Sequence, residues 1–169
     1  MGMLFPNLPY LIDGNTKISE TFAIARYIVN RSGKTDLLGK DIKDQAMVDN
    51  LLGVFKDINE PILGLLLSET FAENKPKNIE KVKPKLDLIE KFYGEKEFAL
   101  GYPTIIDFFV AEFSCHIKGL DKGLYDSYPH LARVNGGVNN LAEIKEFYEV
   151  PLNANRIFVP PNANYQPVK

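Results

Sequence analysis

Three consecutive residues near the start of the chain have the types that bind an anion. Ser19, Glu20 and Thr21 follow a short apolar segment and precede a run whose apolar residues recur at helical spacing. The first N–H groups of a helix have no intrahelical partner, so together with a hydroxyl they attract a carboxylate or a phosphate. With Ser19 at the predicted N-cap position, an anion site is expected around Glu20 and Thr21, although an ordinary helix start has the same composition.

A β-hairpin and a helix are the elements expected to position this site. Tyr10-Leu11-Ile12 is typical of a short strand, and Thr16-Lys17-Ile18 pairs back with it. Asp13-Gly14-Asn15 predicts a tight turn between them, because Gly tolerates a positive φ. The following helix carries Phe22, Ala23, Tyr27 and Ile28 on its apolar side.

The run from Phe5 to Ile28 resembles the C-terminal part of the thioredoxin-like domain of glutathione S-transferases, closest to the mu and sigma classes. Asn7-Leu8-Pro9 is similar to the loop of that family in which the proline is cis and the backbone before it pairs with the cysteinyl backbone of glutathione. Glu20-Thr21 stands where the family usually has Gln-Ser, whose hydroxyl and helix amides hold the γ-glutamyl carboxylate. Glu in place of Gln adds a negative charge near that carboxylate, although it could pair with the amino group of the tripeptide. The resemblance thus implies a glutathione site made of Asn7, Leu8, Pro9, Glu20 and Thr21.

Three further residues are assigned by the same resemblance. Asp57 matches an acid that reaches across the dimer to the amino group of glutathione. Phe5 matches an aromatic residue that fills a pocket of the second subunit, and Arg26 matches an arginine near the two-fold axis. A generic surface acid, a local core aromatic and a solvated helix arginine are the alternatives. An exposed loop aromatic is a good interface anchor, so we expect a homodimer or association with a full-length relative.

In this family an N-terminal Tyr or Ser hydroxyl stabilises the glutathione thiolate, the form that attacks electrophiles. No residue of this chain aligns with that hydroxyl, because the chain starts just before the proline loop and the first strand, first helix and second strand are expected to be absent. We therefore assign no catalytic residue. Two hypotheses stay open: a fragment of an active enzyme, or a family member that has lost catalysis and serves as a structural or accessory subunit of a larger assembly.

The amino-acid composition limits the classes of function and partner that can be expected. The 169 residues are 45% hydrophobic and 25% charged with a net charge of −2, so nothing favours nucleic acid or an anionic membrane as a partner. The chain has no apolar run long enough to cross a bilayer, and its single cysteine excludes an internal disulfide and fits a reducing compartment. We expect a cytoplasmic protein, or a mitochondrial one as part of an assembly. No cofactor is expected, glutathione being a substrate or ligand, and the two histidines are too scattered for a metal site.

The predicted fold class is mostly α: a glutathione-transferase C-terminal helical bundle preceded by a truncated thioredoxin-like ββα remnant. The partial thioredoxin-like domain covers residues 1–31, a linker covers 32–40, and the all-α domain covers 41–150. Residues 151–169 carry four prolines, so an extended tail over the surface is expected.

Proline and glycine set the expected helix limits in the all-α domain. One long helix should run from Asp41 to about Phe71 with a kink at Pro61. A second should open at Pro76, be interrupted at Pro84 and stop at Gly94. The apolar face of the long helix comprises Met47, Val48, Leu51, Leu52, Phe55, Ile58, Ile62 and Leu65.

Thr104 and Asp107 have the spacing of a capping box ahead of an apolar run. The pattern resembles the core helix of the transferase C-terminal domain, where it serves folding rather than chemistry. On that helix Cys115 is expected to be a buried, inert thiol. The pair Gly136-Gly137 has no phosphate-loop context and is expected to form a turn between helices.

Overall fold

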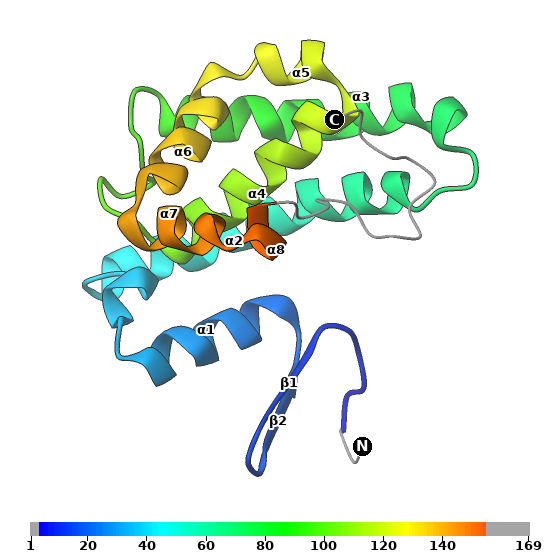
Figure 1. Ribbon diagram of the computed structural model, residues 1–169. Helices are drawn as coiled ribbons and strands as arrows, with labels where there is room; N and C mark the ends of the chain where they lie inside the picture. The colour runs from blue at the N-terminus through cyan, green and yellow to red at the C-terminus, as the bar shows by residue number, and fades with distance from the viewer. Residues whose placement is uncertain (1–3, 155–169) are drawn as a thin grey trace. The chain divides into compact units, whose positions relative to one another are not determined.

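The computed structural model describes residues 4–154 (Figure 1). It confirms a mostly helical fold with one small sheet. The chain divides into two compact units between Leu52 and Gly53. No helix of the described residues is long and apolar enough to cross a membrane.

The first unit opens with the predicted hairpin. Strands β1 (Tyr10–Asp13) and β2 (Thr16–Ser19) pair antiparallel, with Tyr10 opposite Ser19 and Asp13 opposite Thr16. Gly14 in the turn has a φ of 58°, a conformation that Gly adopts without steric cost. The sequence therefore placed both strands and the turn correctly.

The helix that follows, α1 (Thr21–Ser32), starts one residue later than expected. Ser19 is not its N-cap, because pairing with Tyr10 keeps Ser19 in the sheet and its hydroxyl donates to the Phe5 carbonyl over 2.8 Å. Glu20 takes the N-cap position instead. Gly33 ends the helix in the left-handed conformation, which is typical of a glycine at a helix C-terminus.

Beyond α1, residues 32–40 contain structure of their own. A 3-10 helix, η1 (Thr35–Leu38), contacts α1 and buries Leu38. Asp41 then caps α2 (Ile42–Leu66), since its Oδ1 accepts the N–H groups of Lys43 at 2.8 Å and Asp44 at 3.0 Å. This helix begins in the first unit and ends in the second.

Two predicted helix limits are wrong. The long helix α2 ends at Leu66 rather than near Phe71, and α3 (Phe71–Tyr93) begins five residues before Pro76. A polar cluster organises this start: the Asn74 amide donates to the Thr70 hydroxyl over 2.7 Å and to the Ser68 hydroxyl over 3.2 Å.

The prolines inside α3 do not interrupt it. Pro76 and Pro84 each remove one helical hydrogen bond, to the carbonyls of Ala72 and Glu80. Both of these residues are exposed, so water can bond to the carbonyls and the helix continues. Gly94 ends the helix as predicted.

The second unit is built around α4 (Ile105–Leu120), which contacts both α5 (Lys122–Asp126) and α6 (Pro129–Asn140). Helix α6 also contacts α3 and α7 (Ala142–Glu149). The phenyl ring of Phe55 packs against those of Phe109 and Phe113, with ring centroids 5.9 and 5.6 Å apart. The apolar face predicted for the long helix is buried except at Met47, which is 38% exposed.

Two predictions near the end of the chain need correction. Gly136 and Gly137 lie within α6 rather than in a turn. A Cβ on Gly137 would come within 2.3 Å of Cγ of Glu97, so glycine there permits a close approach of that segment. The tail is not extended from its first residue, because Pro151–Ala154 forms the short helix α8. The rest of the predicted tail lies outside the described residues.

Candidate functional site

The loop before β1 and the start of α1 bring together five of the six residues predicted to bind glutathione; the sixth, Asp57, belongs to the second unit. The peptide bond between Leu8 and Pro9 is cis, as the resemblance implies. Leu8 is 78% exposed and its N–H donates to Oδ1 of Asn7 over 2.9 Å. Among the described residues nothing donates to the Leu8 carbonyl, so that oxygen is available to a ligand.

A side-chain contact joins this loop to the helix start. Nδ2 of Asn7 donates to Oε1 of Glu20 over 3.1 Å, across thirteen positions of sequence. The contact orients the Glu20 carboxylate beside the first turn of α1. Spacing alone gave no signal for this pairing, which depends on the fold of the intervening hairpin.

Glu20 has a backbone conformation that is unusual for its type. Its φ is 73°, and it is the one residue other than Gly with a positive φ among those described. A side chain in this region costs about 1–2 kcal/mol, and such strain gathers where a ligand is held. The sequence gave no sign of it, because Gly is the residue expected at such a position.

Thr21 is the first residue of α1 and is exposed. No side chain caps this helix, and the first bond inside it runs from the N–H of Ile24 to the Glu20 carbonyl over 2.9 Å. The start of α1 therefore offers helix amides and the Thr21 hydroxyl to an anion. With the Glu20 carboxylate beside it, the site suits a group that carries both a carboxylate and an ammonium.

Helix α1 is held on the hairpin by a polar contact that sequence reasoning missed. The Tyr27 hydroxyl donates to Oδ2 of Asp13 over 2.8 Å, and Nε of Arg31 lies 3.4 Å from the same oxygen. The hydrogen bond from Tyr27, followed by that from Arg31, lowers the pKa of the Asp13 carboxyl. These contacts hold the second half of α1 at the hairpin turn.

The other residues assigned by resemblance lie as follows. Phe5 is 75% exposed, and Arg26 forms an ion pair with Asp49 inside the first unit. Asp57 belongs to the second unit, where it pairs with Lys85, and the hydrogen bond from Lys85 lowers the pKa of its carboxyl. Their roles at a dimer interface and in binding glutathione stay predictions.

Within residues 4–154, no three side chains of His, Cys, Asp or Glu are grouped so that they could hold a metal ion.

Sequence comparison identifies the family. The model described as "Glutathione S-transferase, N-terminal domain" matches residues 2–30. The chain is 30% identical over 148 residues to glutathione S-transferase Mu 2 of Mus musculus, covering 87% of this chain and 66% of that protein. It is 33% identical over 132 residues to glutathione S-transferase Mu 2 of Homo sapiens, covering 78% of this chain and 59% of that protein. The chain belongs to the glutathione S-transferase family.

Structural comparison agrees with this assignment. The solved structure of the glutathione S-transferase Blo t 8 superposes with a TM-score of 0.81 at 20% identity, covering 98% of this chain and 78% of that one. This likeness shows the transferase fold. The chain spans just under two thirds of the length of the first of those relatives and less of the second.

Proposed function

We propose that this glutathione S-transferase family member binds glutathione with the Asn7–Pro9 loop and the start of α1, and takes part in conjugating it to electrophiles. The observation that supports the proposal is the hydrogen bond between Asn7 and Glu20, which places an exposed loop carbonyl, an acidic side chain and an uncapped helix start together. A tripeptide with a free α-amino acid end and an exposed backbone matches these three groups.

Each group then has a partner on the ligand. The Thr21 hydroxyl and the helix amides bind the γ-glutamyl carboxylate, which the positive end of the helix dipole also favours. The Glu20 carboxylate accepts from the ammonium of the same γ-glutamyl group. The Leu8 carbonyl accepts the cysteinyl N–H, and this fixes the direction of the thiol.

Conjugation needs one further group. The thiolate attacks an electrophilic carbon, and a hydroxyl that donates to the sulfur lowers the pKa of the thiol. We assign no residue of this chain to that step. The proposal is therefore that this chain binds glutathione. The hydroxyl that activates the thiol comes from a segment or subunit outside the residues described.

Calorimetric titration of the full chain with glutathione tests this proposal. Thr21→Val keeps the shape of the side chain and removes the hydroxyl, so glutathione should bind about tenfold more weakly, as a lost hydrogen bond to a charged group predicts. The matched control is Thr35→Val, at an exposed residue in η1 of the same unit. Cysteinylglycine, which lacks the γ-glutamyl group, should bind weakly to both the wild type and the variants.

Two results would overturn the assignment of this site. One is a wild-type chain that shows no heat of binding at millimolar glutathione. The other is an affinity that falls equally in Thr21→Val and Thr35→Val.

The hairpin favours a second candidate, a non-catalytic accessory subunit. No further described strand pairs with β1 or β2, and two apolar side chains of β1 are exposed, Tyr10 at 40% and Ile12 at 50%. Unpaired strand edges of this kind invite another chain. The exposed Phe5 supports the same association, including a homodimer.

Sedimentation and an activity assay separate the two candidates. For an accessory subunit, we expect a concentration-dependent assembly that Ile12→Lys and Phe5→Ser weaken, and no conjugation of chlorodinitrobenzene. Conjugation by the purified chain that persists when assembly is lost would exclude this second candidate.

A further inference from the structure

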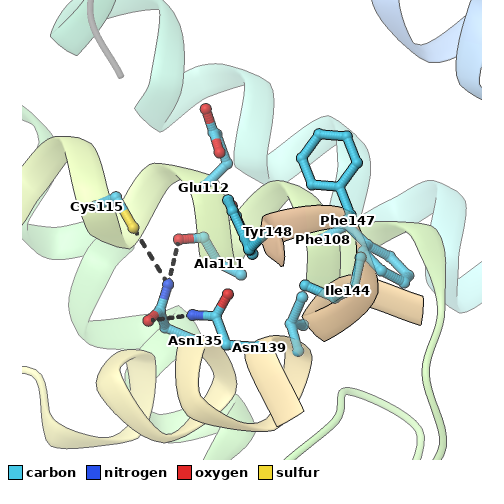
Figure 2. A pocket seen from close by; sticks show the side chains of 10 residues that line it. Phe108, Ala111, Glu112, Cys115, Asn135, Asn139, Ile144, Phe147 and Tyr148 are labelled. Carbon is cyan, nitrogen blue, oxygen red and sulfur yellow. Dashed lines mark hydrogen bonds between the residues drawn. The ribbon is translucent and has the colours of Figure 1, made fainter. Parts of the chain in front are cut away.

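A pocket in the second unit is lined by side chains of α4, α6 and α7 and encloses about 430 Å³ (Figure 2). Packed cores leave few voids larger than a water molecule, and small-molecule sites run from roughly 300 to 1,000 Å³. Most of the described lining residues are apolar or aromatic, and none of them is assigned to glutathione. An occupant with apolar groups would gain free energy by covering this surface.

Exposed apolar side chains join the pocket to the end of α7. Phe147 lines the pocket beside Ile144, and it is 40% exposed although its ring meets that of Tyr148 edge-on, with centroids 5.3 Å apart (Figure 2). Val150, three positions after Phe147, is 50% exposed. The exposed apolar surface therefore continues from the pocket toward the last residues that the structure describes.

The chain leaves α7 beside this pocket. Nδ2 of Asn153 in α8 donates to the Phe147 carbonyl over 2.8 Å, and the N–H of Asn153 donates to the Val150 carbonyl over 2.9 Å. These bonds hold α8 next to a residue that lines the pocket. The five residues after Ala154 can span about 16–18 Å when extended, which exceeds the roughly 8–10 Å between the axes of packed helices. The next segment of the chain is therefore long enough to reach into the pocket.

The sequence of that segment suits an apolar pocket. Ile157, Phe158 and Val159 are three consecutive apolar residues, and Pro160 and Pro161 follow them. Proline fixes φ and has no N–H, so this composition favours an extended segment over a longer α8. Burial of the three apolar side chains is the free-energy gain that favours docking.

Amide groups on α6 offer a hydrogen-bond partner for the backbone of such a segment. Nδ2 of Asn135 donates to the Ala111 carbonyl over 2.9 Å and to Sγ of Cys115 over 3.3 Å (Figure 2). Oδ1 of Asn135 then accepts from Nδ2 of Asn139 over 3.0 Å. Because a carbonyl can only accept, this order orients both amides, and Oδ1 of Asn139 is left as an acceptor to which no described residue donates. An extended peptide supplies N–H groups of the kind that this oxygen accepts.

We propose that residues 155–161 fold back from α8 and fill this pocket in the same chain. Phe158 lies against the rings of Phe108 and Phe147, and a backbone N–H of the segment donates to Oδ1 of Asn139. The tether favours this occupant over a free molecule, because a short linker gives an effective concentration in the millimolar range. The docked segment thus closes the pocket to small molecules.

Cys115 reports whether the pocket is occupied. It is the single cysteine of the chain, is half-buried, and lies in the pocket wall (Figure 2). A docked segment shields its thiol, so loss of docking should speed its alkylation by iodoacetamide. Mass spectrometry of the full chain reads the rate of alkylation at this one site.

Phe158→Ser removes the ring proposed to fill the pocket. Alkylation of Cys115 should become about tenfold faster, as the loss of one buried phenyl ring predicts. Tyr165→Ser is the matched control, because it removes an aromatic ring from the same end of the chain beyond the two prolines. Its alkylation rate should stay that of the wild type.

Phe147→Ser changes the pocket instead of the segment, and it should speed alkylation too. The double variant Phe147→Ser/Phe158→Ser should be no faster than the faster single variant, because two residues in contact lose a shared interaction. Far-ultraviolet circular dichroism verifies that each variant keeps its helices.

Three results would overturn the proposal. They are an alkylation rate that Phe158→Ser leaves unchanged, equal effects of Phe158→Ser and Tyr165→Ser, and effects of Phe147→Ser and Phe158→Ser that multiply in the double variant. Protection of Cys115 that disappears on dilution of the wild type would assign the pocket to residues 155–161 of a second copy instead. Glutathione titration of the same samples reads the other site, so failure of one proposal is distinguishable from failure of the other.

Discussion

The hydroxyl of Tyr93 donates a hydrogen bond to Oδ1 of Asp107 over 3.0 Å, and both residues are almost wholly buried. The same carboxylate accepts the N–H of Ala99 at 2.7 Å and both the N–H and the hydroxyl of Thr104 at 2.8 Å. One side chain thereby joins the end of α3, the connecting loop and the start of α4. Burial raises the pKa of the Asp107 carboxyl, and this effect exceeds the lowering by the hydrogen bonds that the carboxylate accepts. Burial raises the pKa of the Tyr93 hydroxyl too.

Tyr93→Phe should lower the free energy of unfolding by about 2 kcal/mol, because it removes a buried hydrogen bond to a carboxylate. Tyr125→Phe is the matched control, since no described residue forms a hydrogen bond with the Tyr125 hydroxyl, and it should cost less than about 0.5 kcal/mol. Urea denaturation of both variants measures the difference. Equal losses would contradict a specific contribution of this hydrogen bond.

The Asp107 cluster shows which part of a site can be predicted from sequence. Thr104 and Asp107 are three positions apart, so a local rule predicts their capping box, and the structure confirms it. Tyr93 and Ala99 donate to the same carboxylate from another helix and a loop. No local pattern predicts those contacts, because they depend on how α3 and α4 pack.

The same distinction applies to the helices and to the glutathione site. The short apolar segments and the turn residues between them predicted the hairpin. The start of α3, in contrast, depends on the hydroxyls of Ser68 and Thr70, which accept hydrogen bonds from the Asn74 amide. The sequence likewise did not predict the contact between Asn7 and Glu20 or the positive φ of Glu20, since both arise from the fold of the hairpin. Resemblance to a family supplied the residues, and the structure supplied their arrangement.

Acid should weaken the contact between α3 and the start of α5. Oδ1 of Asp121 accepts from the N–H of Leu124 at 2.9 Å and Oδ2 lies 3.0 Å from Nζ of Lys75, so the pKa of this carboxyl is lowered, chiefly by the Leu124 bond. A lowered pKa stabilises the folded state above the unfolded value near 3.8, and this stability is lost as the pH falls through the folded pKa.

Comparison with Asp121→Asn isolates the effect, because Asn still caps a helix but carries no charge. Urea denaturation should show the variant less stable at pH 7, with the difference shrinking below pH 3.8. A difference that stays constant from neutral pH to the acid limit would contradict a contribution from the ionised carboxylate.

Substitution by Ala should lower the free energy of unfolding by very different amounts at two glycines of the first unit. Gly39 has a φ of 114°, and a Cβ there would lie 2.5 Å from the backbone nitrogen of Gln45. Gly33 has a φ of 76°, with nothing within 4 Å of an added Cβ. Gly33→Ala should therefore cost about 1 kcal/mol through backbone strain alone, and Gly39→Ala about 3 kcal/mol or more because rigid backbone blocks the methyl group. Thermal denaturation of both variants gives the comparison, and similar losses would show that α2 can move away from Gly39.

The backbone of Glu20 offers a test that separates strain from binding. Glu20→Gly and Glu20→Ala both remove the carboxylate and the hydrogen bond from Asn7, so they differ only in how well residue 20 tolerates a φ of 73°. The Gly variant should be more stable than the Ala variant by about 0.5–1 kcal/mol, because relief of strain exceeds the entropy that Gly loses on folding. Both should bind glutathione equally weakly if the carboxylate holds the ammonium of the ligand. Urea denaturation and calorimetry read the two quantities separately. An Ala variant as stable as the Gly variant would show that residue 20 does not keep its positive φ, and an affinity unchanged from wild type would remove Glu20 from the glutathione site.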